Sequence, residues 1–117
     1  MNLAVITELP LVILNVQRGG PSTGLPTKSE QTDLLQALFG RNGESPMPVI
    51  AATSPTNCFD AAYYASKMAL EHMTPVVLLT DAFVANGSGA FKLPDLNDYP
   101  DICPPYVTPE MAGSYTP

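Results

Sequence analysis

The chain has 117 residues, about the size of one domain and enough to bury one hydrophobic core. Hydrophobic residues make up 45% of it and charged residues 14%, so most of the chain is expected to fold rather than to stay disordered. The formal net charge of −6 argues against a nucleic-acid partner, because a phosphate backbone requires a basic surface on the protein.

Short apolar runs predict β-strands at three places. The first, residues 11–16, is rich in β-branched side chains and almost continuously apolar, which is the pattern of a strand covered on both faces of a parallel sheet. It follows residues 2–8, which have the spacing of a short helix that Pro10 prevents from continuing. The same apolar pattern returns at residues 48–52 and 75–80.

Helical patterns separate these strands. Apolar side chains at spacings of three and four predict a helix over residues 29–39, which Gly40 ends, and a longer helix over residues 57–72. Strand, helix, strand, helix, strand corresponds to successive βαβ units, so the sequence predicts an α/β fold with a parallel sheet in three layers. The sheet would be thin, because such folds normally have about five or six strands.

The last part of the chain has a different composition. From residue 94 onward it is rich in proline and aspartate, without a helical or alternating pattern. We therefore expect residues 1–93 to form the α/β domain and residues 94–117 to form an extended linker or tail that is mobile at its end. Before this boundary, residues 86–89 read Asn-Gly-Ser-Gly, which is a turn signal.

The sequence favours a cytoplasmic protein. The apolar run over residues 9–16 is too short for a bilayer crossing, and the N-terminus lacks the cationic region of a signal peptide. Cys58 and Cys103 lie far apart and lack the spacing of a metal site, so we expect reduced thiols and no bound metal. A Cys58–Cys103 disulfide is the less favoured alternative.

The most informative segment is the glycine-rich run of residues 18–27, between the first strand and the helix that follows it. It lies at the carboxyl end of a buried strand, where open α/β sheets bind their ligands. Its glycines allow backbone N–H groups to approach a bound group closely. Arg18 suits a carboxylate or a phosphate, and the alternative is an exposed arginine paired with Glu30 or Asp33.

Hydroxyl residues of the same run have two interpretations. Ser22 and Thr23 lie between glycines, where a hydroxyl either caps local backbone groups or faces a ligand. Thr27 and Glu30 have the spacing of a capping box, which would fix the start of the following helix.

Other polar residues carry weaker signals. Ser54 to Asn57 fit a helix N-terminus better than an anion site. Asp81 ends the third strand at the same sheet edge as Arg18 and is interpreted as a helix cap or hydrogen-bond acceptor near the site. His72 lies near a helix end, where its charge suits the helix dipole better than it suits a general base. Without a nucleotide fingerprint, a cysteine cluster or a Ser/His/Asp group, the chain is not expected to perform redox chemistry alone.

The run from Gln17 to Gln31, preceded by Thr7-Glu8-Leu9-Pro10 and an apolar strand, resembles the α subunit of 2-oxoacid:ferredoxin oxidoreductases. It is most similar to the enzymes that use 2-oxoglutarate. Weaker similarity continues through residues 52–60, 73–81 and 85–88, so that the resemblance covers about residues 1 to 95.

The resemblance implies a fold and a set of site residues. The domain would be part of the pyrimidine-binding domain of a thiamine diphosphate enzyme, whose earlier strands lie upstream in the family. Arg18 would bind the carboxylate of the 2-oxoacid, with Thr23 and Thr27 beside it in the pocket. Possible loop contacts are Gly19, Gly20, Ser22 and Gly24. No catalytic residue is expected in this chain.

The resemblance also implies partners. The family decarboxylates a 2-oxoacid with thiamine diphosphate, transfers electrons to ferredoxin and passes the acyl group to coenzyme A. A β subunit would carry the diphosphate, Mg²⁺ and an iron–sulfur cluster, while this chain would form one wall of the cofactor site. The family's Tyr-Pro-Ile-Thr-Pro motif and activating glutamate are missing, so we expect a fragment of an α subunit that is inactive alone. The alternatives are a stand-alone anion-binding module and an inactive remnant.

Overall fold

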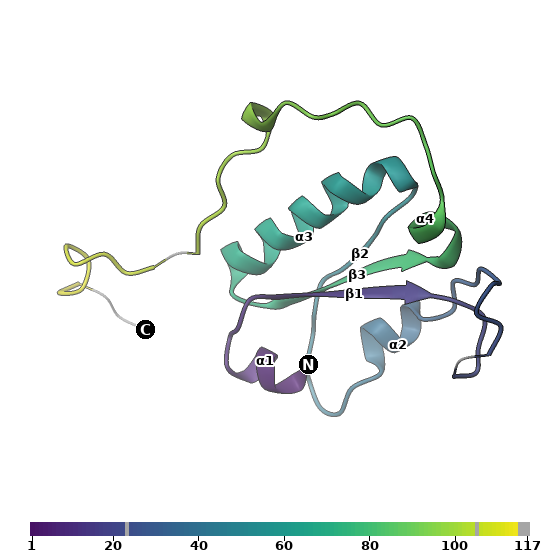
Figure 1. Ribbon diagram of the computed structural model, residues 1–117. Helices are drawn as coiled ribbons and strands as arrows, with labels where there is room; N and C mark the ends of the chain where they lie inside the picture. The colour runs from purple at the N-terminus through teal and green to yellow at the C-terminus, as the bar shows by residue number, and fades with distance from the viewer. Residues whose placement is uncertain (23, 105, 115–117) are drawn as a thin grey trace.

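The computed structural model describes residues 1–22, 24–104 and 106–114 (Figure 1). Its strands and helices follow the order expected from the sequence. They are α1 (Asn2–Ile6), β1 (Leu11–Gln17), α2 (Leu34–Phe39), β2 (Val49–Ala51), α3 (Cys58–His72), β3 (Pro75–Asp81) and α4 (Ala82–Asn86), with 3-10 turns at Pro55–Asn57 and Leu96–Asp98.

The strands form one parallel sheet in the order β1-β3-β2, which confirms the predicted α/β class. β3 is the central strand, and all seven of its residues are buried. It pairs with β1 along its whole length, from Leu11 opposite Pro75 to Gln17 opposite Asp81. β2 is shorter and pairs only over residues 49–51. The carboxyl ends of β1 and β3 therefore lie side by side at one edge of the sheet.

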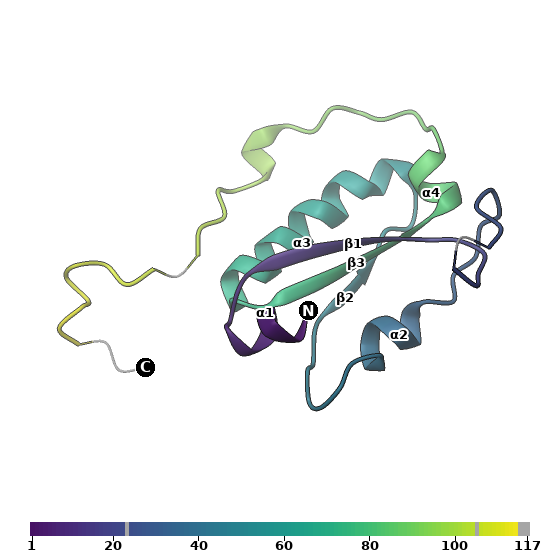
Figure 2. The same cartoon turned by 60° about the horizontal axis from the view of Figure 1, so that its bottom comes forward.

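Helices cover both faces of the sheet (Figures 1 and 2). On one face, the alanines of α3 pack against alternate residues of β3. This cluster contains Ala61, Ala65, Ala69, Val76 and Leu78. On the other face, α1 and α2 cover the remaining residues of β3, in a cluster of Ala37, Met47, Val77 and Leu79. Because side chains alternate along a strand, β3 supplies the centre of both layers.

The long helix α3 begins as the sequence predicts. Ser54 Oγ accepts a hydrogen bond from the backbone N–H of Asn57 at 3.1 Å, and Pro55 occupies the first turn, where its missing N–H costs nothing. The helix ends at His72, before Met73 turns into the left-handed region at φ 47°. The interpretation of Ser54 to Asn57 as a helix start is therefore confirmed.

The expected start of the helix after the glycine-rich run is wrong. α2 begins at Leu34 instead of residue 29, and Thr27 and Glu30 do not form a capping box. The carboxylate of Glu30 accepts a hydrogen bond from the backbone N–H of Gly20 at 3.1 Å instead. A contact across the loop thus replaces the local contact that the sequence spacing suggested.

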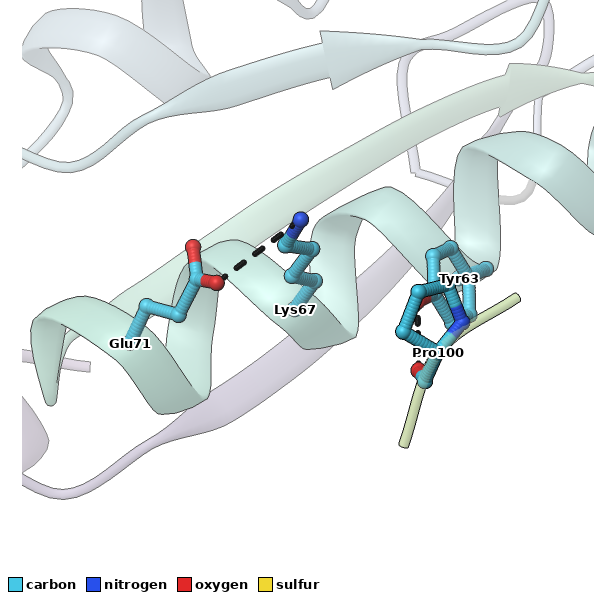
Figure 3. A network of polar contacts seen from close by, with 4 residues as sticks. All are labelled: Tyr63, Lys67, Glu71 and Pro100. Carbon is cyan, nitrogen blue, oxygen red and sulfur yellow. Dashed lines mark hydrogen bonds and ion pairs between the residues drawn. The ribbon is translucent and has the colours of Figure 1, made fainter. Parts of the chain in front are cut away.

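After α4 the chain crosses the outer side of α3 before it leaves the domain (Figure 1). The ring of Tyr99 packs edge-on against Phe59 and Tyr63, with centroid distances of 5.2 and 4.9 Å. The hydroxyl of Tyr63 donates to the carbonyl oxygen of Pro100 at 2.7 Å (Figure 3). The segment around residues 91–100 is therefore attached to α3, and its aromatic contacts explain why the chain follows the outer side of this helix. Where the domain ends and a linker begins stays a prediction.

Both cysteines are free thiols, Cys58 half-buried and Cys103 exposed, so the alternative of a disulfide between them is wrong. Across the described parts of the chain, we find no helix with the length and apolar character needed to span a membrane.

Candidate functional site

The glycine-rich loop starts at the carboxyl edge of the sheet, beside the end of β3. Gln17 lies opposite Asp81 in the sheet register, so Arg18 and Asp81 share this edge, as the sequence predicts for parallel strands. Arg18 is exposed. The carboxylates considered as its partners bind elsewhere: Glu30 to the N–H of Gly20, and Asp33 to the side-chain amide of Asn15 at 3.1 Å.

Neither Glu30 nor Asp33 therefore neutralises the charge of Arg18, which is able to bind an anionic ligand. Within the described part of the chain, the ion pair that forms is Lys67 with Glu71 at 3.8 Å, one turn apart on α3 (Figure 3). An exposed guanidinium without a carboxylate partner at this edge can bind a carboxylate or phosphate through two parallel hydrogen bonds.

Backbone hydrogen bonds close the loop on itself. The N–H of Gly19 donates to the carbonyl of Lys28 and the N–H of Leu25 donates to the carbonyl of Gly19, both at 3.0 Å. The N–H of Gly24 donates to Pro21 at 2.9 Å. Because these N–H groups and that of Gly20 bond within the chain, a ligand would meet the side chains of the loop rather than these donors. Contacts from the glycines to a ligand stay a prediction.

Gly24 is required by the closed loop. Its φ is +31°, and a Cβ at this position would lie 2.4 Å from the carbonyl oxygen of Gly19. A side chain cannot fit at that distance, and the conformation is unfavourable for other residues. The loop geometry therefore depends on a glycine here.

The predicted hydroxyl residues lie in different surroundings. Thr27 is exposed on the wall of a shallow hollow of about 620 Å³ between the loop and α4. The hollow is lined by Pro26, Thr27 and Ser29 on the loop side and by Ala82, Phe83, Asn86 and Gly87 on the other. Ser22 is exposed, with a left-handed φ of 56°. Thr23 lies outside the described residues.

Asp81 joins the loop segment to α4. Its Oδ1 accepts from the backbone N–H of Val84 at 2.8 Å and caps α4, while its Oδ2 accepts from Gln31 Nε2 at 2.5 Å. The interpretation of Asp81 as a cap near the site is therefore confirmed. The hydrogen bond from Gln31 and those from the first turn of α4 hold the pKa of this buried carboxyl below its usual range.

A second hollow, of about 400 Å³, lies at the carboxyl ends of β2 and β3 beside Asp81. Its lining includes the polar residues Gln17, Gln31, Thr53, Thr80 and Asp81. The hydroxyl of Thr80 is buried and has no hydrogen-bond partner among the described residues. Sequence analysis did not single out Gln17, Gln31 or Thr80, although their place at the ends of two strands and in the resembling run was a usable signal.

Among the described residues at this edge, the guanidinium of Arg18 suits an anion, and the carboxylate of Asp81 is engaged in hydrogen bonds on both oxygens. His72 ends α3 just before β3 begins, so it lies at the opposite edge of the sheet from Arg18. A general-base role for His72 at this site is therefore wrong. In the described residues, no group of three or more His, Cys, Asp and Glu side chains could hold a metal ion.

Comparisons with known proteins identify the family of the chain. A family model described as pyruvate flavodoxin/ferredoxin oxidoreductase, thiamine diphosphate-binding, matches residues 1–116. The 2-oxoglutarate oxidoreductase subunit KorA of Mycobacterium tuberculosis is 55% identical over 109 residues, which are 93% of this chain and 17% of that protein. The 2-oxoglutarate synthase subunit KorA of Archaeoglobus fulgidus is 41% identical over 98 residues, 84% of this chain and 28% of that protein.

A solved structure is also similar. It is a 2-oxoglutarate:ferredoxin oxidoreductase from Magnetococcus marinus with 2-oxoglutarate, coenzyme A and succinyl-CoA bound, and it matches with a TM-score of 0.79 and 34% identity. The match covers 88% of this chain and 18% of that one. The chain thus spans less than a third of each relative. The resemblance to 2-oxoacid:ferredoxin oxidoreductase α subunits and the thiamine-binding fold type are confirmed, and the chain belongs to the thiamine diphosphate-binding domain family of the pyruvate flavodoxin/ferredoxin oxidoreductases.

Proposed function

We propose that this chain is part of the α subunit of a 2-oxoacid:ferredoxin oxidoreductase, where it binds the carboxylate of the substrate and forms one wall of the cofactor site. The observation that carries the proposal is Arg18, which extends from a closed loop at the carboxyl edge of the sheet without a carboxylate partner in the described part of the chain. An arginine in this position holds a planar carboxylate in one orientation through two hydrogen bonds.

The preferred substrate in this proposal is 2-oxoglutarate. Support comes from the relatives, since the two KorA proteins are named for 2-oxoglutarate and the similar solved structure contains 2-oxoglutarate. Arg18 would bind the carboxylate that leaves as carbon dioxide. Thr27, exposed on the hollow beside α4, and Thr23 would line the pocket next to it. The chain's contribution is then to fix the substrate's position and orientation.

In this proposal the chain forms one wall of a thiamine diphosphate site, and its described residues do not fit the metal-binding end of that site. Mg²⁺ prefers carboxylate and other oxygen ligands, and the described residues contain no group of acidic side chains that could hold a metal. Asp81, the carboxylate at this edge, already accepts hydrogen bonds on both oxygens. The chemistry that thiamine diphosphate supplies when bound is a nucleophilic carbon for decarboxylation.

The remaining components would come from partners. We infer a β subunit that holds the diphosphate, Mg²⁺ and an iron–sulfur cluster, with coenzyme A as second substrate and ferredoxin as electron acceptor. The family description names thiamine diphosphate, and the similar structure contains coenzyme A and succinyl-CoA, which supports this division. The free thiols of Cys58 and Cys103 favour a cytoplasmic location, because disulfides are rare there.

A titration tests the proposal. The chain, alone and assembled with a thiamine-binding β subunit, is titrated calorimetrically with 2-oxoglutarate, pyruvate and inorganic phosphate. We expect 2-oxoglutarate to bind most tightly and Arg18→Ala to weaken its binding at least tenfold, since about 1.5–3 kcal/mol of charge-assisted hydrogen bonding is lost.

The matched control is Lys92→Ala, which removes one positive charge from an exposed residue outside the glycine-rich loop. It should leave the affinity within twofold of the unmodified chain. Equal losses of affinity in the two variants would mean that Arg18 acts only through its charge and not through direct hydrogen bonds to the substrate. Phosphate binding more tightly than every 2-oxoacid would instead support a stand-alone anion-binding module.

A further inference from the structure

One hydrogen bond at the sheet edge has no part in the substrate binding proposed above. The side-chain amide of Gln31 donates to Asp81 Oδ2 at 2.5 Å, although the two residues are 50 positions apart in sequence. Asp81 is only 4% exposed, and its other oxygen caps α4 through Val84. A single buried carboxylate therefore connects the segment that follows the glycine-rich loop with the helix that faces it.

The other contacts of this segment reach different parts of the fold. Lys28 and Glu30 accept hydrogen bonds from the loop residues Gly19 and Gly20. The backbone N–H of Asp33 donates to the side chain of Gln17 in β1 at 3.0 Å. Among the hydrogen bonds recorded for the described residues 28–33, the one from Gln31 is the link to β3 and α4. Residues 28–33 are thus linked to β1 through Asp33, which bonds to Gln17 and Asn15, and to the end of β3 through Gln31.

This link lies between the two chain segments that line the hollow with Thr27 on its wall. Pro26, Thr27 and Ser29 line one wall, and residues 82–87 supply the other. Gln31 follows the first wall by two residues, and Asp81 immediately precedes the second. The hydrogen bond between Gln31 and Asp81 therefore connects the chain just beyond one wall with the chain just before the other.

We propose that Gln31 and Asp81 are positioning residues for the substrate site: their hydrogen bond holds the loop that carries Arg18 and Thr27 at a fixed distance from α4. This inference rests on the proposed function. Both residues act through the loop and not by touching the substrate. Loss of the bond leaves the fold intact but lets the loop shift relative to α4, and a misplaced anchoring group binds the substrate more weakly.

The test measures KM and kcat for 2-oxoglutarate in the assembled, active complex that contains this chain. Gln31→Ala removes the link while leaving the cap of α4 on Asp81 in place. We expect its KM to rise about tenfold with kcat changed less than threefold, because the carboxylate grip acts on both the bound substrate and the transition state. The matched control is Gln36→Ala, an exposed glutamine on α2. It should leave both constants within twofold.

A reciprocal exchange separates positioning from general stability. Gln31→Glu places two carboxylates against each other and should raise KM at least as much as Gln31→Ala. Combining Gln31→Glu with Asp81→Asn restores a donor and an acceptor with their roles reversed. The amide introduced at position 81 can still accept from the N–H of Val84 and can donate to the carboxylate introduced at position 31. The double variant should recover a KM within threefold of the unmodified complex.

Equal KM values for Gln31→Ala and Gln36→Ala, or no recovery in the exchanged pair despite normal thermal unfolding, would overturn the inference. Failure of the proposed function gives a different result: the unmodified complex would then show no turnover of 2-oxoglutarate, and its binding would not respond to Arg18→Ala.

Discussion

The hydroxyl of Tyr99 donates a hydrogen bond to the carboxylate of Asp60, and the two residues are 39 positions apart in sequence. Tyr99 belongs to the segment that leaves the domain, and Asp60 lies in the first turn of α3. Together with the edge-on contacts of the Tyr99 ring, this bond fixes the path of the chain over α3. Phe59 and Tyr63 of α3 thus hold this segment on the outer surface of the domain, away from the alanines that face the core.

This contact predicts an unusual titration of Tyr99. The hydrogen bond to Asp60 and the negative charge of that carboxylate raise the pKa of Tyr99 to about 12. Because the pKa is raised above its unfolded value of 10.0, the contact stabilises the attached segment fully below pH 10 and is lost as the pH rises toward 12. Ultraviolet titration should show a tyrosine with this high pKa, and Asp60→Asn should return it toward 10. An unchanged titration in Asp60→Asn would contradict the assignment.

Asp81 predicts a pH dependence in the acid range. Its pKa is lowered in the folded chain by Gln31 and the backbone of α4, from a value of 3.8 in the unfolded chain. The stabilisation is therefore present above about pH 4 and is lost as the pH falls through the lower, folded pKa. Thermal unfolding of the chain and of Asp81→Asn between pH 7 and pH 2 should show a difference that shrinks at the acid end. A constant difference would mean that the charge of Asp81 is not the cause.

Because α3 lies close against the sheet, we expect the stability of the fold to depend on the size of the α3 side chains that face the sheet. Ala65 has no exposed surface and lies in the cluster with Val76 and Leu78. We expect Ala65→Leu to lower the free energy of unfolding by about 1–3 kcal/mol, because extra methylene groups overpack the interface. Urea denaturation measures the change. Ala62→Leu, on the exposed side of the same helix, is the control and should cost less than about 0.5 kcal/mol.

The backbone conformation of Gly24 predicts that a side chain at this position lowers both stability and substrate binding. Gly24→Ala places a Cβ against the carbonyl of Gly19 at a positive φ, so the closed loop must open. We expect a destabilisation of about 1 kcal/mol or more and weaker binding of 2-oxoglutarate in the calorimetric titration. Gly113→Ala, at a position where a Cβ meets nothing within 4 Å, should change neither quantity. Unchanged binding in Gly24→Ala would show that the closed loop is not needed for the site.

Local patterns in the sequence were enough to predict the strands and the long helix. The β-branched run of β1 and the apolar spacing of three and four in α3 depend on neighbours in sequence, and both elements appear where expected. The start of α2 could not be predicted this way, because Glu30 binds Gly20 across the loop instead of capping a helix. The hydrogen-bond partner of Glu30 is a backbone N–H ten residues away, which becomes available only once the loop closes.

The candidate site was predictable in part. Arg18 and Asp81 were placed at the same edge because parallel strands end together, and the register confirms that placement. Gln31 was not identified as a site residue although it ends the resembling run, and its hydrogen bond to Asp81, 50 positions away, is set by the fold and not by its neighbours in sequence. The role of Thr27 as a ligand contact stays a prediction, and that of Thr23 lies outside the described residues.

The strand order also determines when this domain can fold during synthesis. β1 and β2 are both paired to β3, and β3 comes last in the chain of the three. Of the three described strands, the first two therefore leave the ribosome before the strand that pairs with both, and until residues 75–81 emerge α3 can cover only the smaller apolar contributions of Val12 and Ile50. A nascent chain stopped before β3 would leave the β3-facing side of β1 open to chaperones and to other chains, whereas extension by these seven residues would join the three described strands in one cooperative step.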